Sequence, residues 1–335
     1  MFNVAVVGAT GAVGTTMIRV LEERGFPVTE LRPLASARSA GREIDFLGKP
    51  FTVQELTEDS FENIQIALFS AGSPRSLAFA PAAVEAGAVV IDNSSAYRMD
   101  PNVPLVVPEV NEEAIAGHAG IIANPNCVAA PLVVALKPIA DAVGLQRVIV
   151  SSYQSVSGTG HDAIDELRAQ TAGNLDGDEP PPSVYPHPIA FNALPHIDAF
   201  EDSGYTGEEV KVANETRKLL SLPDLAVSAT CVRVPVFYSH SQAVHIETVE
   251  PLTADHARQL LMVSPGVVVL DEPALNIYPL ARDATGRDEV FVGRIRNDAS
   301  HPRGLALWVV ADNLRKGAAT NAVQIAESLV MRGWL

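Results

Sequence analysis

Near its amino terminus the chain reads VAVVGATGAVG over residues 4–14. The four leading apolar residues predict a buried strand, and the glycines at every third position predict a tight turn into a helix. In such a turn Gly8 permits the bend, Gly11 lets backbone N–H groups approach a pyrophosphate, and Gly14 allows close helix packing. The usual dinucleotide-binding turn has glycine where Thr10 stands, so the spacing favours a dinucleotide site but leaves open a turn without a ligand.

The first third of the chain alternates short apolar runs with helical patterns, which is typical of a parallel sheet with crossover helices. The first strand, over residues 4–7, leads into a helix over residues 14–24. Further strands are expected at residues 30–34, 64–70, 89–92 and 120–123. Each is followed by Gly, Pro, Ser or Asn, at the strand ends where open α/β sheets hold ligands.

From about residue 145 the strands become longer and richer in Val, Ser and Thr, which predicts a second domain with a mixed or antiparallel sheet. Its expected strands are residues 147–154, 226–236, 243–249, 290–295 and 305–311, and its expected helices are residues 207–220 and 254–262. Residues 176–188 contain five prolines and no periodicity, so we expect an irregular segment. One hypothesis is that this segment forms an oligomer contact. The pattern over residues 318–330 predicts an amphipathic terminal helix, whose partner sheet periodicity does not identify.

Composition limits the class of protein. A length of 335 residues predicts roughly two domains, and 47% apolar against 19% charged residues excludes a disordered or fibrous chain. The formal charge of −16 argues against nucleic-acid binding, which needs a basic surface. The longest apolar run is far short of the ~20 residues of a membrane helix, and no secretory signal is visible. With only two cysteines, we expect a cytoplasmic protein without disulfides, without a metal site and without a membrane or nucleic-acid partner.

The end of the second expected strand bears on the choice of dinucleotide. An acidic residue there would bind the ribose 2′-hydroxyl of NAD, but the chain has Ser36, Arg38 and Ser39. A cation and two hydroxyls suit the 2′-phosphate of NADP, while the alternative is a solvated loop arginine.

Cys127 is the candidate nucleophile. It follows a buried strand and Asn126, the expected N-cap of the next helix, so its sulfur would lie at a first helical turn that stabilises a thiolate. A buried structural thiol is the alternative, and it is our interpretation of Cys231, which lies inside an alternating strand. His240 is the best candidate of eight histidines for a partner base, because it lies at the end of a strand.

A helix start at residues 206–209 has the pattern of a capping box. Thr206 would cap the helix and Glu209 would reach back to it, which makes Glu209 structural. Glu208 and Lys211 share a face, and by themselves they predict a solvated surface on which Lys211 pairs with Glu215.

Several blocks, taken in order, resemble aspartate-semialdehyde dehydrogenase. They are the turn at residues 8–14, NSSAYRM at 93–99, NPNC at 124–127, QSVSG at 154–158, PHPIAFN at 186–192, the spacing of Arg233 and His240, and DNLRKG at 312–317. The resemblance covers nearly the whole chain, and blocks in the right order are far more specific than any one of them.

This resemblance implies a two-step reaction. Cys127 would attack the aldehyde of aspartate semialdehyde, a hydride would pass to NADP, and inorganic phosphate would cleave the acyl thioester to give aspartyl phosphate. In the cell the reaction would run in reverse, in the biosynthesis of lysine, methionine and threonine and of diaminopimelate. His240 would take and return the proton, Gln154 would orient the substrate, and Asn126 would support the turn that carries the thiol.

The resemblance also assigns binding residues. Arg98 and Lys211 would bind phosphate, Arg233 the substrate carboxylate and Glu208 the substrate ammonium. The expected NADP contacts are Gly8, Thr10, Gly11, Ala12, Val13, Ser36, Arg38, Ser39, Ser157, Gly158 and Asn313.

The implied fold is α/β, with a Rossmann-like NADP-binding domain and an α+β catalytic and dimerisation domain on a mixed sheet. The first would comprise residues 1–126 and 313–335 and the second residues 127–312, in a homodimer or, alternatively, a tetramer. Three positions depart from the family pattern: Val128 replaces a small hydroxyl residue, Ser239 replaces a frequent glycine, and Gln242 replaces a frequent acid.

Two other functions remain open. N-acetyl-gamma-glutamyl-phosphate reductase uses a similar thioester, but its substrate has no free ammonium for Glu208 to bind. A non-catalytic cofactor-binding homologue is the other alternative, against which the joint presence of Cys127, Gln154 and His240 argues.

Overall fold

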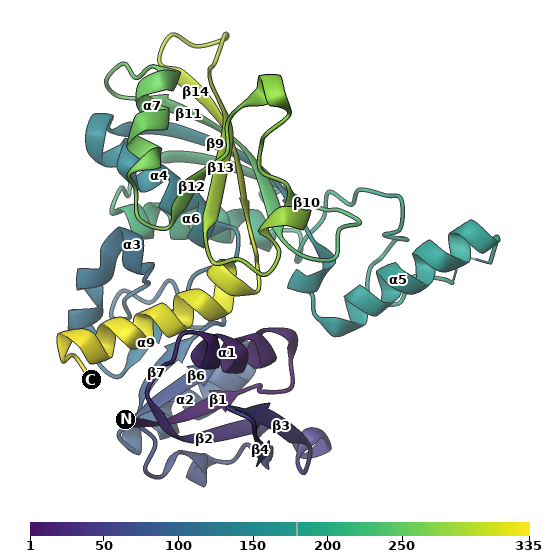
Figure 1. Cartoon of the computed structure of the whole chain (residues 1–335), viewed down its shortest axis with the longest axis vertical. Coiled ribbons are helices and arrows are strands. Elements are labelled where there is room, and N and C mark those ends of the chain that lie inside the picture. The colour runs from purple at the N-terminus through teal and green to yellow at the C-terminus, as the bar shows by residue number, and fades with distance from the viewer. Residues whose placement is uncertain (179) are drawn as a thin grey trace. The chain divides into compact units, whose positions relative to one another are not determined.

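The computed structural model describes residues 1–178 and 180–335, which form two compact units (Figure 1). One unit comprises Met1–Asn126 and Ala318–Leu335, and the other comprises Cys127–Gly317. The chain therefore returns to its first unit at residue 318, where the sequence analysis expected residue 313.

The first unit contains a six-stranded parallel sheet in the order β5-β2-β1-β6-β7-β8. Its strands are β1 (Phe2–Val7), β2 (Val28–Ala35), β5 (Gln54–Glu55), β6 (Ile66–Phe69), β7 (Val89–Asp92) and β8 (Ile121–Ala123). The strand order runs outward in both directions from the β1–β6 pair, and open α/β sheets bind dinucleotides at such a point. A separate hairpin joins β3 (Glu43–Phe46) and β4 (Lys49–Thr52).

Helices cover both faces of this sheet. Val4 and Val6 of β1 belong to a core with α1 (Ala12–Glu23) and α9 (Thr320–Arg332), while Ala5 and Val7 belong to a core with α2 (Ser73–Glu85). This alternation follows from the two-residue period of a strand. The terminal helix thus has its partner, which periodicity had left open. The short helices of this unit are η1 (Ala37–Ser39), η2 (Glu58–Phe61), α3 (Pro108–Asn111) and η3 (Glu112–Gly117).

The second unit contains a six-stranded mixed sheet in the order β10-β9-β11-β14-β13-β12, which confirms the expected mixed sheet. Its strands are β9 (Leu145–Gln154), β10 (Ala226–Arg233), β11 (His240–Thr248), β12 (Val267–Val269), β13 (Val290–Asn297) and β14 (Gly304–Ala311). The β9–β10 and β12–β13 pairs are parallel and the other pairs are antiparallel. β10 ends before residue 236, the expected end, because Pro235 has no N–H to donate to a ladder.

Helices α4 (Ala129–Val143), α6 (Gly207–Leu220) and α7 (Ala254–Met262) pack on one face of this sheet (Figure 1). Val148 and Val150 of β9 are buried, whereas Tyr153 points to the opposite face and is 39% exposed. Among the described residues, that opposite face carries no helix of comparable length. The remaining elements of this unit are η4 (Val156–Gly158), α5 (His161–Asp176), η5 (Pro273–Leu275), α8 (Ala281–Ala284) and the π-helical turn η6 (Arg315–Ala319), which leads back to the first unit.

The segment over residues 176–188 begins where α5 ends, and its residue 179 lies outside the described residues. Glu166 of α5 holds the irregular chain that follows, since its Oε2 accepts hydrogen bonds from the backbone N–H groups of Ser183 and Val184 at 2.7 and 2.6 Å. We had not predicted α5, whose sequence has little apolar periodicity. In the described part of the chain, none of the helices has the length and apolar character of a membrane span.

Candidate functional site

Four side chains of the second unit meet where strands β9, β10 and β11 adjoin. Gln154 and Arg233 are the last residues of the parallel strands β9 and β10 and lie opposite each other in the register. His240 is the first residue of the neighbouring strand β11. Its Nε2 lies 3.4 Å from Sγ of Cys127, which is within hydrogen-bond distance for sulfur. The structure therefore brings the candidate nucleophile and the candidate base together.

Cys127 lies in a turn that precedes α4. The helix begins at Ala129 with Val128 as its N-cap, so the prediction that Asn126 caps the helix was wrong. The turn is held by the Val128 carbonyl, which accepts from the Leu132 N–H and also from Nε2 of Gln242 at 3.1 Å. The departure at Gln242 thus supplies a donor that an ionised acid at this position would lack.

Gly317 packs directly against this turn. A Cβ added at Gly317 would lie 3.1 Å from the Cβ and the carbonyl oxygen of Cys127. We had not identified Gly317 as a site residue, although it is part of the family block at residues 312–317. Cys127 itself is half-buried, whereas Cys231 is buried, which confirms the structural interpretation of Cys231. Burial raises the pKa of the Cys231 thiol to about 12.

His240 is buried, and burial together with the positive charge of Arg233 holds its pKa well below the usual range. The ring is therefore neutral at neutral pH. The preceding residue, Ser239, has a φ of 70°, in the left-handed region that favours glycine at a cost of about 1 kcal/mol to other residues. Its N–H donates to Oδ1 of Asn313 at 2.9 Å, which anchors the chain just before the ring.

Glu208 lies at the same end of the sheet. It is 7% exposed, and its Oε1 accepts from Nε2 of Gln154 at 3.2 Å, so the solvated face expected from helical spacing was wrong. Its neighbour Glu209 forms the predicted capping box with Thr206 and also accepts from the Cys231 N–H, which confirms its structural role. Glu215 is buried, so the predicted surface pair with Lys211 was also wrong.

Arg233 is 5% exposed and is only partly satisfied. One of its Nη atoms donates to the Ser155 carbonyl at 2.7 Å, whereas its buried Nε has no hydrogen-bond partner within the described chain. A buried guanidinium N–H without a partner is costly and marks a position where a ligand oxygen would be well placed.

Lys211, on α6, pairs with Asp198. Its Nζ lies 2.5 Å from Oδ2, and this hydrogen bond lowers the pKa of Asp198 below its usual value. Sequence reasoning missed Asp198, because it lies in an irregular segment where nothing marks it as a partner of a helix thirteen residues away. The pair holds Lys211 in place while leaving a third of its side chain exposed.

Arg98 belongs to the first unit and is buried. Its Nε donates to the carbonyl of Asn124 at 2.9 Å and one Nη donates to that of Asn93, also at 2.9 Å. These carbonyls follow β8 and β7, so the guanidinium lies at the carboxyl ends of the sheet.

The glycine turn has the geometry expected of a phosphate cradle. Gly8 follows β1 with a φ of 84°, and α1 begins at Ala12 with Gly11 as N-cap, two residues before the expected start. A Cβ at Gly14 would lie 2.1 Å from the Gly8 carbonyl oxygen, and one at Gly8 would lie 2.6 Å from the Ser70 carbonyl oxygen beyond β6. The helix start, which includes Val13, has no side-chain cap, so its N–H groups are available to an anion.

The residues expected around the 2′-phosphate lie at the end of β2. Ser36 precedes the short helix η1, Arg38 within it is exposed, and Ser39 is buried with its Oγ 3.4 Å from Oγ1 of Thr10. The structure thus connects this segment with the glycine turn. Ser157, Gly158 and Asn313, by contrast, belong to the second unit, where Asn313 Oδ1 lies 3.1 Å from Ser157 Oγ.

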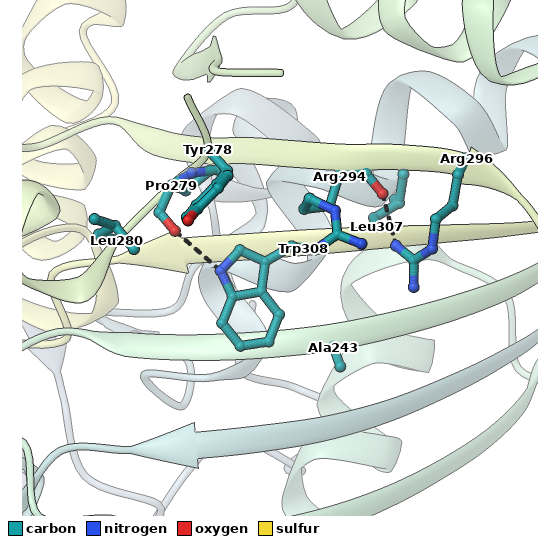
Figure 2. Close-up of a pocket in the computed structure, with 8 residues that line it drawn as sticks. All are labelled: Ala243, Tyr278, Pro279, Leu280, Arg294, Arg296, Leu307 and Trp308. Carbon is teal, nitrogen blue, oxygen red and sulfur yellow. Dashed lines mark hydrogen bonds between the residues drawn. The ribbon is translucent and has the colours of Figure 1, made fainter. Parts of the chain in front are cut away.

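A separate pocket opens on the face of the second sheet that lacks long helices (Figure 2). Tyr278 and Arg294 lie beside Trp308, whose Nε1 donates to the Pro279 carbonyl at 3.1 Å, and Arg296 lies beyond Arg294, to whose carbonyl it donates at 2.7 Å. None of the predicted site residues lines this pocket.

Comparisons with known proteins give one consistent result. The family model described as semialdehyde dehydrogenase, NAD binding domain, matches residues 3–118, and the model described as semialdehyde dehydrogenase, dimerisation domain, matches residues 136–316. The chain is 56% identical to the aspartate-semialdehyde dehydrogenase of Aquifex aeolicus over 99% of both chains.

Solved structures agree. The structure of aspartate semialdehyde dehydrogenase II from Vibrio cholerae, complexed with ASA, is 54% identical and superposes with a TM-score of 0.96 over 99% of this chain and 98% of that one. A Candida albicans aspartate semialdehyde dehydrogenase with NADP is 25% identical, with a TM-score of 0.77 over the full length of both chains. The chain therefore belongs to the aspartate-semialdehyde dehydrogenase family, oxidoreductases that act on an aldehyde group and carry an NAD(P)-binding domain.

Proposed function

We propose that the chain interconverts L-aspartate 4-semialdehyde and L-aspartyl 4-phosphate with NADP and inorganic phosphate, through a thioester on Cys127. The observation that carries the proposal is the 3.4 Å approach of Cys127 Sγ to His240 Nε2 beside Gln154 and Arg233. In the biosynthetic direction the aldehyde would supply lysine, methionine, threonine and diaminopimelate.

The side chains around Cys127 suit a small amino-acid substrate. The guanidinium of Arg233 can bind a carboxylate, and the buried carboxylate of Glu208 can accept from an ammonium group. Gln154 lies between Glu208 and Arg233. Its amide donates to Glu208, and it is the register partner of Arg233 on the neighbouring strand. An N-acetylated substrate would leave Glu208 facing a neutral amide, which disfavours an N-acetyl-gamma-glutamyl-phosphate reductase.

The direct test is an absorbance assay of NADPH formation from aspartate semialdehyde, with and without phosphate. We expect sustained turnover only with phosphate, because only phosphate releases the acyl group from the thioester. Comparable turnover of N-acetyl-glutamate semialdehyde would favour the reductase instead, and the absence of any phosphate-dependent change would favour a non-catalytic homologue.

We infer that the cofactor is NADP and that it lies on the glycine turn. The uncapped start of α1 fits a pyrophosphate, the turn before it needs glycine at positions 8 and 14 because backbone carbonyl oxygens leave no room for a Cβ, and the Candida albicans relative carries NADP. Ser36, Arg38 and Ser39 would contact the 2′-phosphate at the end of β2. Asn313 would contact the nicotinamide, which when bound exchanges a hydride with the substrate carbon that Cys127 attacks, and Ser157 and Gly158 would form a turn that contacts the cofactor.

Arg38→Ala is expected to reduce the preference for NADP over NAD by about tenfold or more. The substitution removes a charge-assisted hydrogen bond of about 1.5–3 kcal/mol to the 2′-phosphate, which NAD lacks. Dissociation constants for both cofactors, measured by fluorescence titration, provide the test. Arg42→Ala, which changes another exposed arginine of the same segment, is the control and should leave the preference unchanged. Equal weakening of both cofactors by Arg38→Ala would mean that Arg38 has a structural role only.

We propose that Arg98 and Lys211 bind phosphate. Lys211→Met should raise the KM for phosphate at least tenfold and change the KM for aldehyde much less, because only phosphate loses a charged donor. Lys137→Met is a matched control: the Lys137 side chain is also 32% exposed, and its Nζ pairs with Asp141 at 2.6 Å. If the KM for aldehyde alone rose, the assignment of Lys211 would be wrong.

We further propose a cytoplasmic homodimer. Two free cysteines suit a reducing compartment, and the dimerisation-domain match together with the sheet face around Tyr153 and Trp308, which carries no long helix in the described chain, favours a dimer built on that face. Sedimentation equilibrium distinguishes a dimer from a tetramer.

A further inference from the structure

Three asparagine side chains form a chain of hydrogen bonds within the first unit. Asn321, the second residue of α9, donates from Nδ2 to Oδ1 of Asn124 at 2.6 Å. Asn124, directly after β8, donates from its own Nδ2 to Oδ1 of Asn93, directly after β7. The strands β7 and β8 are neighbours in the parallel sheet. The chain of amides therefore connects the terminal helix with the carboxyl ends of two adjoining strands.

Two backbone carbonyls fix the direction of these hydrogen bonds. Nδ2 of Asn321 also donates to the Val106 carbonyl at 2.9 Å, and Nδ2 of Asn124 also donates to the Ala318 carbonyl at 3.0 Å. A carbonyl oxygen only accepts, so turning either amide over would place two acceptor oxygens against each other. Asn124 and Asn321 are fully buried, where water does not replace a lost hydrogen bond. Each of these two amides therefore has a single favourable orientation.

Asn124 and Asn93 also hold the guanidinium of Arg98, through their backbone carbonyls. Nε of Arg98 donates to the Asn124 carbonyl and one Nη donates to the Asn93 carbonyl, both at 2.9 Å. The side chains of the two asparagines meanwhile bind each other, and that hydrogen bond sets the spacing of the carbonyls that Arg98 spans. Asn321 supports it from the other side of Asn124. The position of the guanidinium thus depends on a side chain of the terminal helix.

We propose that Asn321 is a positioning residue for the phosphate site, and that it acts on Arg98 through Asn124 and Asn93. The inference deepens the proposed function, since it rests on the binding of phosphate by Arg98. A guanidinium binds a phosphate oxygen strongly only at the right distance and angle, so a shift of about 0.5 Å in the two carbonyls weakens binding without removing any charge. If Asn321 only stabilised the core, its loss would lower the melting temperature and leave phosphate binding by the folded protein unchanged.

Asn321→Ala removes the donor without adding a charge. We expect the KM for phosphate to rise about tenfold, and the KM for aspartate semialdehyde and the Kd for NADP to change much less, at a temperature where circular dichroism shows the variant to be folded. Asn321→Ser keeps a hydroxyl that can donate one hydrogen bond, so we expect a smaller rise of about threefold.

Gln324→Ala is the matched control. It also removes an amide of α9, but one whose Nε2 donates to Glu109 of α3 at 3.0 Å and so holds the helix to a different element of the same unit. We expect a lower melting temperature with an unchanged KM for phosphate. An unchanged KM in Asn321→Ala as well would overturn the proposal.

A double-mutant cycle with Arg98→Met separates positioning from a general loosening of the first unit. Without the guanidinium, Asn321 has nothing to position, so Asn321→Ala should change the KM for phosphate less than about twofold in that background. A rise of about tenfold in both backgrounds would contradict an action through Arg98. If Asn321→Ala does not fold, the same cycle with Asn321→Ser decides the question.

Binding of inorganic phosphate without turnover distinguishes this inference from the proposed function. Line broadening of the ³¹P signal of phosphate, titrated with the full chain, gives the Kd for wild type and for each variant, and we expect it to change by the same factors as the KM. A wild type that binds phosphate but does not oxidise aspartate semialdehyde would overturn the proposed function alone, because the Kd values still test Asn321. A wild type that binds no phosphate would overturn the inference.

Discussion

Cys127→Ser is expected to lower turnover by at least ~10³-fold while leaving NADP binding intact. A serine hydroxyl is far less ionised than a thiol at neutral pH, and an alkoxide is a much poorer leaving group for the phosphate step. The substitution is nearly isosteric. The Val128 carbonyl, which accepts from the Leu132 N–H and from Nε2 of Gln242, holds the turn without the thiol, so we expect the fold to be unaffected. Steady-state turnover and a fluorescence titration with NADP measure the two effects separately.

Cys231→Ala is the matched control for this prediction. Cys231 is buried in β10, where its thiol has a hydrogen bond with the Ser152 side chain, so its loss should cost some stability and leave turnover within about threefold of wild type. Near-normal turnover of Cys127→Ser would remove Cys127 from the mechanism.

Arg233→Lys is expected to lower kcat/KM for aspartate semialdehyde by about 10²-fold or more. The guanidinium has one Nη bound to the Ser155 carbonyl and a buried Nε without a partner in the described chain, which leaves a donor edge for a substrate carboxylate. Lysine keeps the charge but cannot make two parallel hydrogen bonds, each worth about 1.5–3 kcal/mol. The loss should appear in kcat/KM and KM for the aldehyde, with the KM for phosphate and the affinity for NADP little changed.

Arg147→Lys provides the comparison for Arg233→Lys. Arg147 lies near the start of β9, at the other end of the β9–β10 pair from Arg233. It is 49% exposed and pairs with Glu247, so lysine should replace it without a kinetic effect. If Arg233→Lys raised the KM for phosphate as much as it impaired aldehyde turnover, Arg233 would not be specific for the substrate carboxylate.

The sequence predicted those elements whose signals are local. α6 and α7 begin and end at the expected residues, and β7 coincides with its expected run, because caps, helical period and apolar content lie within each segment. The start of α4 was misplaced because the N-cap there, Val128, uses no side-chain hydrogen bond and therefore leaves no mark in the sequence. α5 was missed because its buried residues contact an irregular segment instead of forming one apolar stripe on a sheet.

The site was less predictable than the fold, and for a physical reason. Helical spacing put Glu208 on a solvated face, because nothing within α6 shows that this face meets the end of β9. The contact of His240 with Cys127 joins residues 113 positions apart, and those of Ser155 with Asn313 join residues 158 apart. Such contacts depend on strand order in the second sheet, which the hydrophobic pattern of single strands does not specify. Only the resemblance to a family brought these residues into one hypothesis.

The return of α9 to the first unit also bears on how the protein is made. Ala322, Val323, Ile325, Ala326 and Leu329 of this helix complete the core on one face of the amino-terminal sheet, yet they are synthesised only after the whole Cys127–Gly317 unit. The usual order, in which an amino-terminal domain folds first as the ribosome elongates the chain, therefore cannot apply in full. On this face the sheet has only α1, of the longer helices described, to cover it until α9 is synthesised, and the sequence of the Cys127–Gly317 unit is complete before that.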